Sequence, residues 1–178
     1  MATIATTAKT DYNNVQLTEE VKDFIRQNGY YVVHIRKIPT LPCPRCTYRE
    51  PKPHCPVCLG TGYIVKAKPL LVRTQGPARP DFEQVKDTPL SLMGSERRLF
   101  YCLPDAVPIE NDLLVEVTWT VPRDEVLKRG HVLYIHRVYD VEHIEPMHGF
   151  GGELYYYKIA VHDLDIDQSW LLTQLQRD

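Results

Sequence analysis

The sequence predicts a mainly β protein, a small antiparallel barrel or sandwich with a short N-terminal helix and a four-cysteine zinc-ribbon hairpin. Three observations predict this class. Segments rich in β-branched and aromatic residues follow one another through the second half of the chain with short connections. Residues 111–121 alternate apolar and polar side chains, the period of a strand. Four of the five cysteines lie within residues 43–58, in two closely spaced pairs.

The first predicted element is a helix of about three turns that ends at Asn28-Gly29. Thr18 is a suitable N-cap, because its hydroxyl can accept a hydrogen bond from a free N–H group of the first turn. The helix carries one apolar stripe, formed by Val21, Phe24 and Ile25. Residues 1–14 are polar and aperiodic, so they are expected to form a flexible arm.

Six segments are predicted as strands because they are rich in β-branched and aromatic side chains. They cover residues 30–38, 63–73, 97–103, 111–121, 131–144 and 153–164. Pro69 interrupts the second segment, which indicates a sheet edge or a bulge. Residues 74–95 carry prolines and glycines without clear periodicity and are expected to form a long loop.

These elements divide the chain into four parts. The arm of residues 1–14 precedes a barrel or sandwich domain made of residues 15–40 and 63–165. Residues 41–62 form a zinc-ribbon insertion in that domain, and residues 166–178 form a C-terminal tail or short helix. The side chains expected to dock this last part are Ile166, Trp170 and Leu171.

The composition is typical of a globular protein, with 43% hydrophobic and 25% charged residues. A formal net charge of -2 gives no overall basic field, so wholesale capture of nucleic acid is not expected. No apolar run approaches the roughly 18 residues that span a bilayer, and the N-terminus lacks the pattern of a secretory signal. We therefore expect no membrane partner and folding in the cytoplasm, where cysteine pairs favour metal over disulfides.

Cys43, Cys46, Cys55 and Cys58 have the spacing C-x2-C-x8-C-x2-C. A gap of two residues lets both thiolates of a pair bind one ion from a single tight turn, and the second pair completes a tetrahedron. The spacing therefore predicts structural zinc, ahead of disulfides or an iron cluster. Four sulfurs close the coordination sphere, so the ion has no position for a reacting water, and His54 is left out of the ligand set.

Cys102 stands alone among apolar residues and is expected to be a buried, unreactive side chain. His131 and His136 are five positions apart, so on a strand they would point to opposite faces and would not share an ion. Both are expected to be ordinary structural or surface histidines.

Three aspartates alternate near the end of the chain, at Asp163, Asp165 and Asp167. The glycine and the terminal glutamate of a calcium loop are missing, so a solvated strand edge is expected there. No pattern in the sequence combines a nucleophile, a base and an orienting group, and we therefore expect that the protein is not an enzyme.

Basic residues gather in and beside the cysteine segment, with tyrosines among them. The basic residues are Arg36, Lys37, Arg45, Arg49, Lys52, Lys66 and Lys68, and the tyrosines are Tyr48 and Tyr63. Such a composition is found on surfaces that follow a nucleic-acid backbone. The alternative is a solvated hairpin whose cations offset the charge of the thiolates, and both interpretations stay open.

Three short motifs lie chiefly within residues 107–165. Asn111 to Leu114 opens a strand, Tyr134 to Val138 forms the middle of another, and Gly151-Gly152 leads to Tyr155-Tyr156-Tyr157. In these motifs the chain resembles the head-to-tail connector proteins of tailed bacteriophages, in particular the head-closure or stopper class of the virion neck.

The resemblance implies a small β-barrel that assembles in the virion as a homo-oligomeric ring between portal and tail. It implies contacts with portal, adaptor and tail proteins, non-specific contact with DNA in the lumen, and no catalytic residues. In this hypothesis, zinc stabilises a projecting hairpin that is used in subunit contacts. The alternative is a zinc-ribbon accessory protein that binds nucleic acid.

Overall fold

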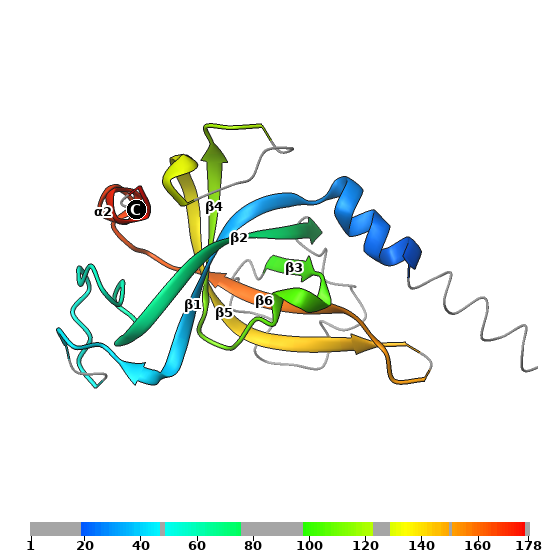
Figure 1. Ribbon diagram of the computed structural model, residues 1–178, viewed down its shortest axis with the longest axis horizontal. Coiled ribbons are helices and arrows are strands. Elements are labelled where there is room, and N and C mark those ends of the chain that lie inside the picture. The colour runs from blue at the N-terminus through cyan, green and yellow to red at the C-terminus, as the bar shows by residue number, and fades with distance from the viewer. Residues whose placement is uncertain (1–18, 47–48, 76–97, 123–128, 150, 177–178) are drawn as a thin grey trace, which may run out of the picture.

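The computed structural model of the protein describes residues 19–46, 49–75, 98–122, 129–149 and 151–176. Within these residues, six antiparallel strands form a closed barrel in the order β1-β2-β3-β6-β5-β4 (Figure 1). The strands are β1 (Tyr30–Pro42), β2 (Tyr63–Gln75), β3 (Arg98–Cys102), β4 (Leu113–Trp119), β5 (Val132–His148) and β6 (Leu154–Asp163). The predicted fold class, a mainly β protein, is confirmed, and of the two predicted architectures the barrel is the one observed.

Helices flank the barrel in the chain. One helix covers residues 19–28 before β1, and α2 (Gln168–Leu175) follows β6. Two short 3-10 helices, η3 (Pro104–Ala106) and η4 (Arg129–His131), lie in connections. In the part of the chain that the structure describes, no helix is long and apolar enough to cross a membrane.

The two helical predictions are confirmed where the structure describes them. The first helix ends just before Gly29, whose backbone N–H donates to the Ile25 carbonyl at 2.8 Å. At the other end of the chain, the Asp167 side chain accepts a hydrogen bond from the Trp170 backbone N–H and begins α2. The predictions for the arm of residues 1–14, for Thr18 and for most of the loop of residues 74–95 fall outside the described residues.

One apolar cluster fills the barrel interior, and all six strands contribute to it. Side chains alternate along a strand, so every second residue of each strand points inward. The buried members of this interior cluster are Val32, Leu70, Val72, Phe100, Cys102, Ala106, Leu114, Tyr139, Val141, Ile159 and Val161. Phe100 and Tyr139 pack edge to face, with their ring centroids 5.3 Å apart. The barrel interior is therefore a packed core.

A second apolar cluster, the outer cluster, covers the outer face of β1, β4 and β5. Its buried members are Val33, Ile35, Leu59, Leu113, Val115, Val132, Ile135, Val138, Leu171 and Leu175. Leu171 and Leu175 come from α2, and Ile166 and Trp170 pack against the same cluster. The docking predicted for Ile166, Trp170 and Leu171 is therefore confirmed.

The two clusters explain why alternation in β4 does not separate buried from exposed residues. Leu113 and Leu114 point to opposite sides, as the sequence pattern predicts. Both are nevertheless buried, because Leu114 enters the barrel interior while Leu113 lies under the outer cluster. The pattern predicts the directions of these two side chains. It does not show that both faces of β4 are buried at this position.

Pro69 lies where β2 has a neighbour on one side only. It pairs with Val33 of β1, whereas β3 pairs with β2 only from Val72 to Gln75 among the described residues. On the side without a neighbour, a proline breaks no strand pairing. The predicted sheet edge is confirmed.

The barrel closes through a short contact between β1 and β4. The paired residues are Val33–Ile35 on β1 and Leu113–Val115 on β4. Beside this contact, His34 Nε2 lies 2.7 Å from Asp112 Oδ2, and both side chains are fully buried. A charged or polar pair inside an apolar core is costly unless its atoms are hydrogen-bonded, so this pair marks a position that tolerates little change.

Asp112 also holds two backbone groups in place. Its carboxylate accepts hydrogen bonds from the backbone N–H groups of Lys37 and Ile109, each at 3.0 Å. The preceding residue, Asn111, has a positive φ of 63°, which turns the chain sharply into β4. One side chain therefore fixes the turn before β4 against β1. No pattern in the sequence indicates this role.

We expect Asp112→Ala to lower the free energy of unfolding by about 3–5 kcal/mol, because it leaves His34 and two backbone N–H groups buried without their acceptor. Urea denaturation would measure the change. Glu110→Ala is the matched control, since Glu110 is an exposed carboxylate two positions earlier, and its effect should stay within about 0.5 kcal/mol. Equal stability of the two variants would contradict the role given to Asp112.

Candidate metal centre

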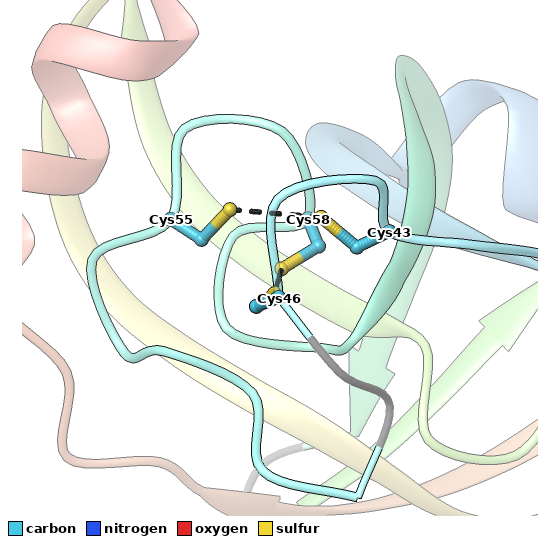
Figure 2. Close-up of side chains that lie close together, drawn as sticks. All are labelled: Cys43, Cys46, Cys55 and Cys58. Carbon is cyan, nitrogen blue, oxygen red and sulfur yellow. Dashed lines mark hydrogen bonds between the residues drawn. The ribbon is translucent and has the colours of Figure 1, made fainter.

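The four cysteines predicted to bind metal come together in the segment between β1 and β2. Their sulfur atoms all lie within 4.8 Å of one another. Figure 2 shows the side chains converging from neighbouring turns, with Cys43 Sγ 3.7 Å from Cys55 Sγ and Cys46 Sγ 3.3 Å from Cys58 Sγ. A disulfide needs a separation of about 2 Å. These cysteines are free thiols, placed where one ion can contact all four sulfurs.

The local sequence explains why the backbone turns tightly enough to aim these sulfurs. Leu59, Gly60 and Gly62 all have positive φ values, of 50°, 83° and 79°. Glycine adopts such angles without steric cost, and two of these three residues are glycines. The Cys43 backbone N–H donates to the Gly62 carbonyl at 2.9 Å and so joins the two ends of the segment.

Backbone N–H groups point at the sulfur atoms. The Arg45 N–H donates to Cys43 Sγ at 3.4 Å. Burial opposes ionisation of the Cys55 thiol, but the N–H groups of Cys58 and Val57 outweigh it and lower the pKa of Cys55 to about 7. Donors of this kind stabilise a thiolate, which is the form that binds a metal ion.

The metal-free cluster cannot hold four thiolates at once. Burial, followed by the hydrogen bond with Cys46, raises the pKa of the Cys58 thiol to about 12. Like charges less than 5 Å apart repel strongly when they are shielded from water. A divalent cation removes this penalty, so the arrangement favours metal binding with release of protons.

The cluster is a closed set of soft ligands. Four sulfurs satisfy a tetrahedral ion and leave no position for a substrate or a reacting water. Among the residues that the structure describes, this is the one group of histidine, cysteine and acidic side chains close enough to share an ion. Leaving His54 out of the ligand set agrees with this geometry, because His54 is not a member of the group.

The cysteine segment is attached to the barrel on one side, where the sequence predicted a projecting hairpin. Leu59, next to Cys58, is only 6% exposed and joins the outer cluster that contains Leu171 of α2. The His54 ring packs edge-on against Trp170, with centroids 5.2 Å apart. Figure 1 shows the segment on the same side of the barrel as α2. The burial of Leu59 could not be predicted from the sequence, since no local pattern shows that it packs in a cluster with residues of α2.

A cleft of about 310 Å³ separates the rest of the segment from the barrel. Apolar residues such as Leu59, Leu113 and Ile166 line it, together with Lys37 and Asp140. Burial raises the pKa of the Asp140 carboxyl and lowers that of the Lys37 amine. None of the described lining residues is a cysteine or a histidine, so the cleft adds no soft ligand to the metal centre.

The histidines considered from the sequence lie apart from the cysteine cluster. His131 ends η4, and His136 is an exposed residue of β5 whose Nε2 lies 2.7 Å from Thr118 Oγ1. Cys102 is fully buried in the barrel interior, as predicted. Burial, followed by the nearby Asp105, raises the pKa of its thiol to about 12, so Cys102 stays protonated.

The three aspartates expected at a solvated edge are exposed in the structure. Asp163 pairs with Arg137 at 3.2 Å, and Asp167 caps α2 and lies 3.7 Å from the exposed His54. Together with Asp165 they form no group close enough to share an ion. These aspartates therefore support the helix end and the strand edge.

Glu116 organises a second polar cluster, which the sequence analysis did not identify. Its carboxylate accepts hydrogen bonds from the hydroxyls of Tyr30 at 2.6 Å and Tyr139 at 2.9 Å, and it pairs with Arg98 at 3.3 Å. Burial, followed by the bond to Glu116, raises the pKa of both tyrosines. The phenols therefore act as donors that satisfy a mostly buried carboxylate, which is a structural arrangement.

Comparisons with known proteins do not assign the chain to a group. No protein-family model matches the chain, and no curated protein sequence is significantly similar to it. The function is therefore argued from the fold and the metal centre.

Removal of the metal is expected to loosen α2 as well as the cysteine segment, because His54 packs against Trp170 and Leu59 shares the outer cluster with Leu171 and Leu175. Hydrogen exchange should show faster exchange in residues 57–62 and 170–175 after chelation, while Ile159 and Val161 of the barrel interior keep their protection. Cys58→Ser should reproduce this result. The matched control, Cys102→Ala, removes a thiol outside the cluster and should retain one metal ion per chain. Unchanged exchange in α2 after chelation would contradict the coupling.

The coupling itself is tested by Leu59→Ala, which removes the apolar contact and keeps all four cysteines. We expect metal to stay bound and the free energy of unfolding to fall by about 2–4 kcal/mol, as for other buried leucines. Leu41→Ala is the control, because Leu41 is 46% exposed near the start of the same segment. Metal analysis combined with urea denaturation would measure both effects, and equal stability of the two variants would argue against a docked segment.

Proposed function

We propose that this protein is a non-enzymatic structural subunit of a phage neck, forming a ring that joins the portal of the head to the tail. The observation that carries the proposal is the position of the connector-like motifs in the fold. The motifs lie at the starts of β4 and β6 and within β5 and β6. These three strands are consecutive neighbours in one small closed barrel. Asn111 and Asp112 form the turn that fixes the closure of this barrel, and Gly151 and Gly152, with φ values of 92° and 81°, turn the chain into β6.

The metal that we assign to the four cysteines is zinc, in a structural role. Four sulfurs bound to Zn²⁺ at about 2.3 Å lie about 3.8 Å apart. The two measured separations of 3.3 Å and 3.7 Å are close to this value. Structural zinc contributes on the order of 10–16 kcal/mol to small metal-bound folds, enough to order a segment with few apolar side chains.

The non-enzymatic assignment is supported by what the reactive side chains do in the structure. The buried thiol of Cys102 packs in the barrel interior, and the hydroxyls of Tyr30 and Tyr139 satisfy Glu116. The four remaining cysteines close a single ligand set. Each of these groups has a structural partner that accounts for it.

Ring assembly requires two different surfaces on each subunit, since a head-to-tail contact joins unlike patches. Large apolar side chains are exposed in several separate parts of the described chain, and two of these parts are considered as subunit contacts. Leu133 and Tyr134, at the start of β5, are 56% and 55% exposed, and Leu41 precedes the cysteine segment. Exposed apolar side chains are candidates for subunit contacts, and a metal-stiffened segment beside Leu41 would present one of them in a fixed orientation.

The alternative function, a nucleic-acid-binding accessory protein, is favoured by the basic residues of β1, β2 and the cysteine segment. It predicts a salt-dependent affinity for free nucleic acid. The neck proposal instead predicts assembly with portal and tail proteins, whether or not free nucleic acid is bound.

Native mass spectrometry of the zinc-loaded full-length protein tests ring assembly. We expect a closed oligomer larger than a dimer, formed alone or with the portal protein encoded nearby, with one zinc ion per chain. Leu133→Glu should weaken the oligomer because it places a charge in a subunit contact, whereas Thr173→Glu, on the exposed side of α2, should not.

Composition of the virus particle provides the second test. The protein should be found in purified virions, and neighbouring reading frames should encode portal and tail proteins. A protein that stays monomeric with the portal protein and is absent from particles would refute the neck assignment.

A further inference from the structure

The hairpin of β1 and β2 has two faces of different character. Strand pairing places Arg36 opposite Lys66 and His34 opposite Lys68, so these four residues share one face. Ile35 pairs with Ala67, and this pair lies on the other face. The strand register therefore shows which of the basic residues lie on the same face of the hairpin, which the sequence alone does not.

The apolar face of the hairpin is already covered. Ile35, Val65 and Ala67 pack in or against the outer cluster together with Leu59 of the cysteine segment. Lys37, which pairs with Val65, lines the cleft near Asp140 and is not part of the basic face. The opposite face turns into the barrel interior at Val32 and His34. Among the described residues, it is exposed at Lys66 and Lys68.

Three basic side chains of this face reach the surface of the part of the chain that the structure describes. Lys66 and Lys68 are exposed, and Arg36 is half-buried. None of the three forms an ion pair with another described residue, and β3 pairs with β2 only from Val72 onwards. We call Arg36, Lys66 and Lys68 the basic strip.

Five other cations of the described residues are paired with carboxylates. The paired residues are Lys22, Arg26, Arg98, Arg137 and Lys158. Like charges directly opposite one another on neighbouring strands are destabilising. The pairing of Arg36 with Lys66 therefore costs stability unless an anion lies over the strip.

We propose that the basic strip binds the phosphate backbone of nucleic acid. Rows of lysine and arginine neutralise phosphates with little regard to base sequence. Protein–protein interfaces are instead depleted in lysine and centre on aromatic or apolar residues. The strip contains two lysines and an arginine, and His34, the residue paired with Lys68, is fully buried. This composition fits a phosphate backbone better than an acidic protein.

Two further exposed cations lie on the cysteine segment, so positive charge is present near the metal centre as well. Arg45 and Lys52 are exposed on the cysteine segment and, like the strip, form no ion pair with another described residue. The inference goes beyond the neck assignment and does not rest on it, since the strip would bind nucleic acid in a monomer as well as in a ring.

Fluorescence anisotropy with labelled duplex and single-stranded oligonucleotides tests the proposal, using the zinc-loaded full chain between about 50 and 200 mM salt. Lys66→Glu/Lys68→Glu should reduce the affinity about tenfold or more at low salt and make the slope of log affinity against log salt shallower by about 2. The control, Lys22→Glu/Lys158→Glu, changes net charge equally at lysines that are ion-paired. Its affinity should stay within about twofold of the unmodified protein.

Folding is checked independently. Lys66→Glu replaces a repulsive cross-strand pair with an attractive one, so its unfolding midpoint should be unchanged or higher and its zinc content unchanged. If a glutamate variant fails to fold, Lys66→Gln/Lys68→Gln removes the charges without adding new ones and should show the same loss of binding.

Three results would overturn the proposal: no salt-dependent binding, equal loss of affinity in strip and control variants, or displacement of the oligonucleotide by polyglutamate at the same charge concentration. The last result would indicate an acidic protein as the partner. Loss of ring assembly with binding intact would refute only the neck assignment.

Discussion

The short contact between β1 and β4 is the constraint on which the rest of the structure depends. It joins only Val33–Ile35 to Leu113–Val115, whereas β1 pairs with β2 and β5 with β6 over most of their lengths. Asp112 compensates by binding the His34 side chain and two backbone N–H groups. Val33 and Ile35 face the outer cluster while His34 faces the interior, so opening this contact would expose both cores to water.

The cysteine segment shares a buried cluster with the barrel. It begins where β1 and β2 extend past the closure contact, and it has too little apolar material to fold around a core of its own. Metal ligation would replace that core, and Leu59 adds the segment to the outer cluster that also holds α2 and Val33. A bound metal would therefore stabilise more than the cysteine segment, because Leu59 of this segment belongs to the cluster that covers the contact between β1 and β4.

The parts of this structure that could be predicted from the sequence are the local ones. Strand positions, the cysteine spacing and the end of the first helix follow from short-range patterns. The pairing of His34 with Asp112 joins residues 78 positions apart, and the sequence shows only a histidine in an apolar run and an ordinary turn. Leu59 is similar, because it is buried in a cluster whose other members lie far from it in the sequence. Alternation predicts that Leu114 points away from Leu113, but it does not predict that both are buried, since the second buried face exists only once the barrel has closed.

A metal centre without an open coordination position has a physical use at this place in the fold. A two-stranded hairpin is marginally stable in water by itself, and the cross-strand repulsion between Arg36 and Lys66 weakens this one further. The barrel fixes one end of the hairpin, and a metal bound by Cys43 and its three partners would fix the other. Binding to an anionic partner then requires little further ordering of the backbone, which raises affinity without any new contact. In this arrangement, the ion would set the position of positive charge on the protein surface, a role that needs tight ligation and no reactivity.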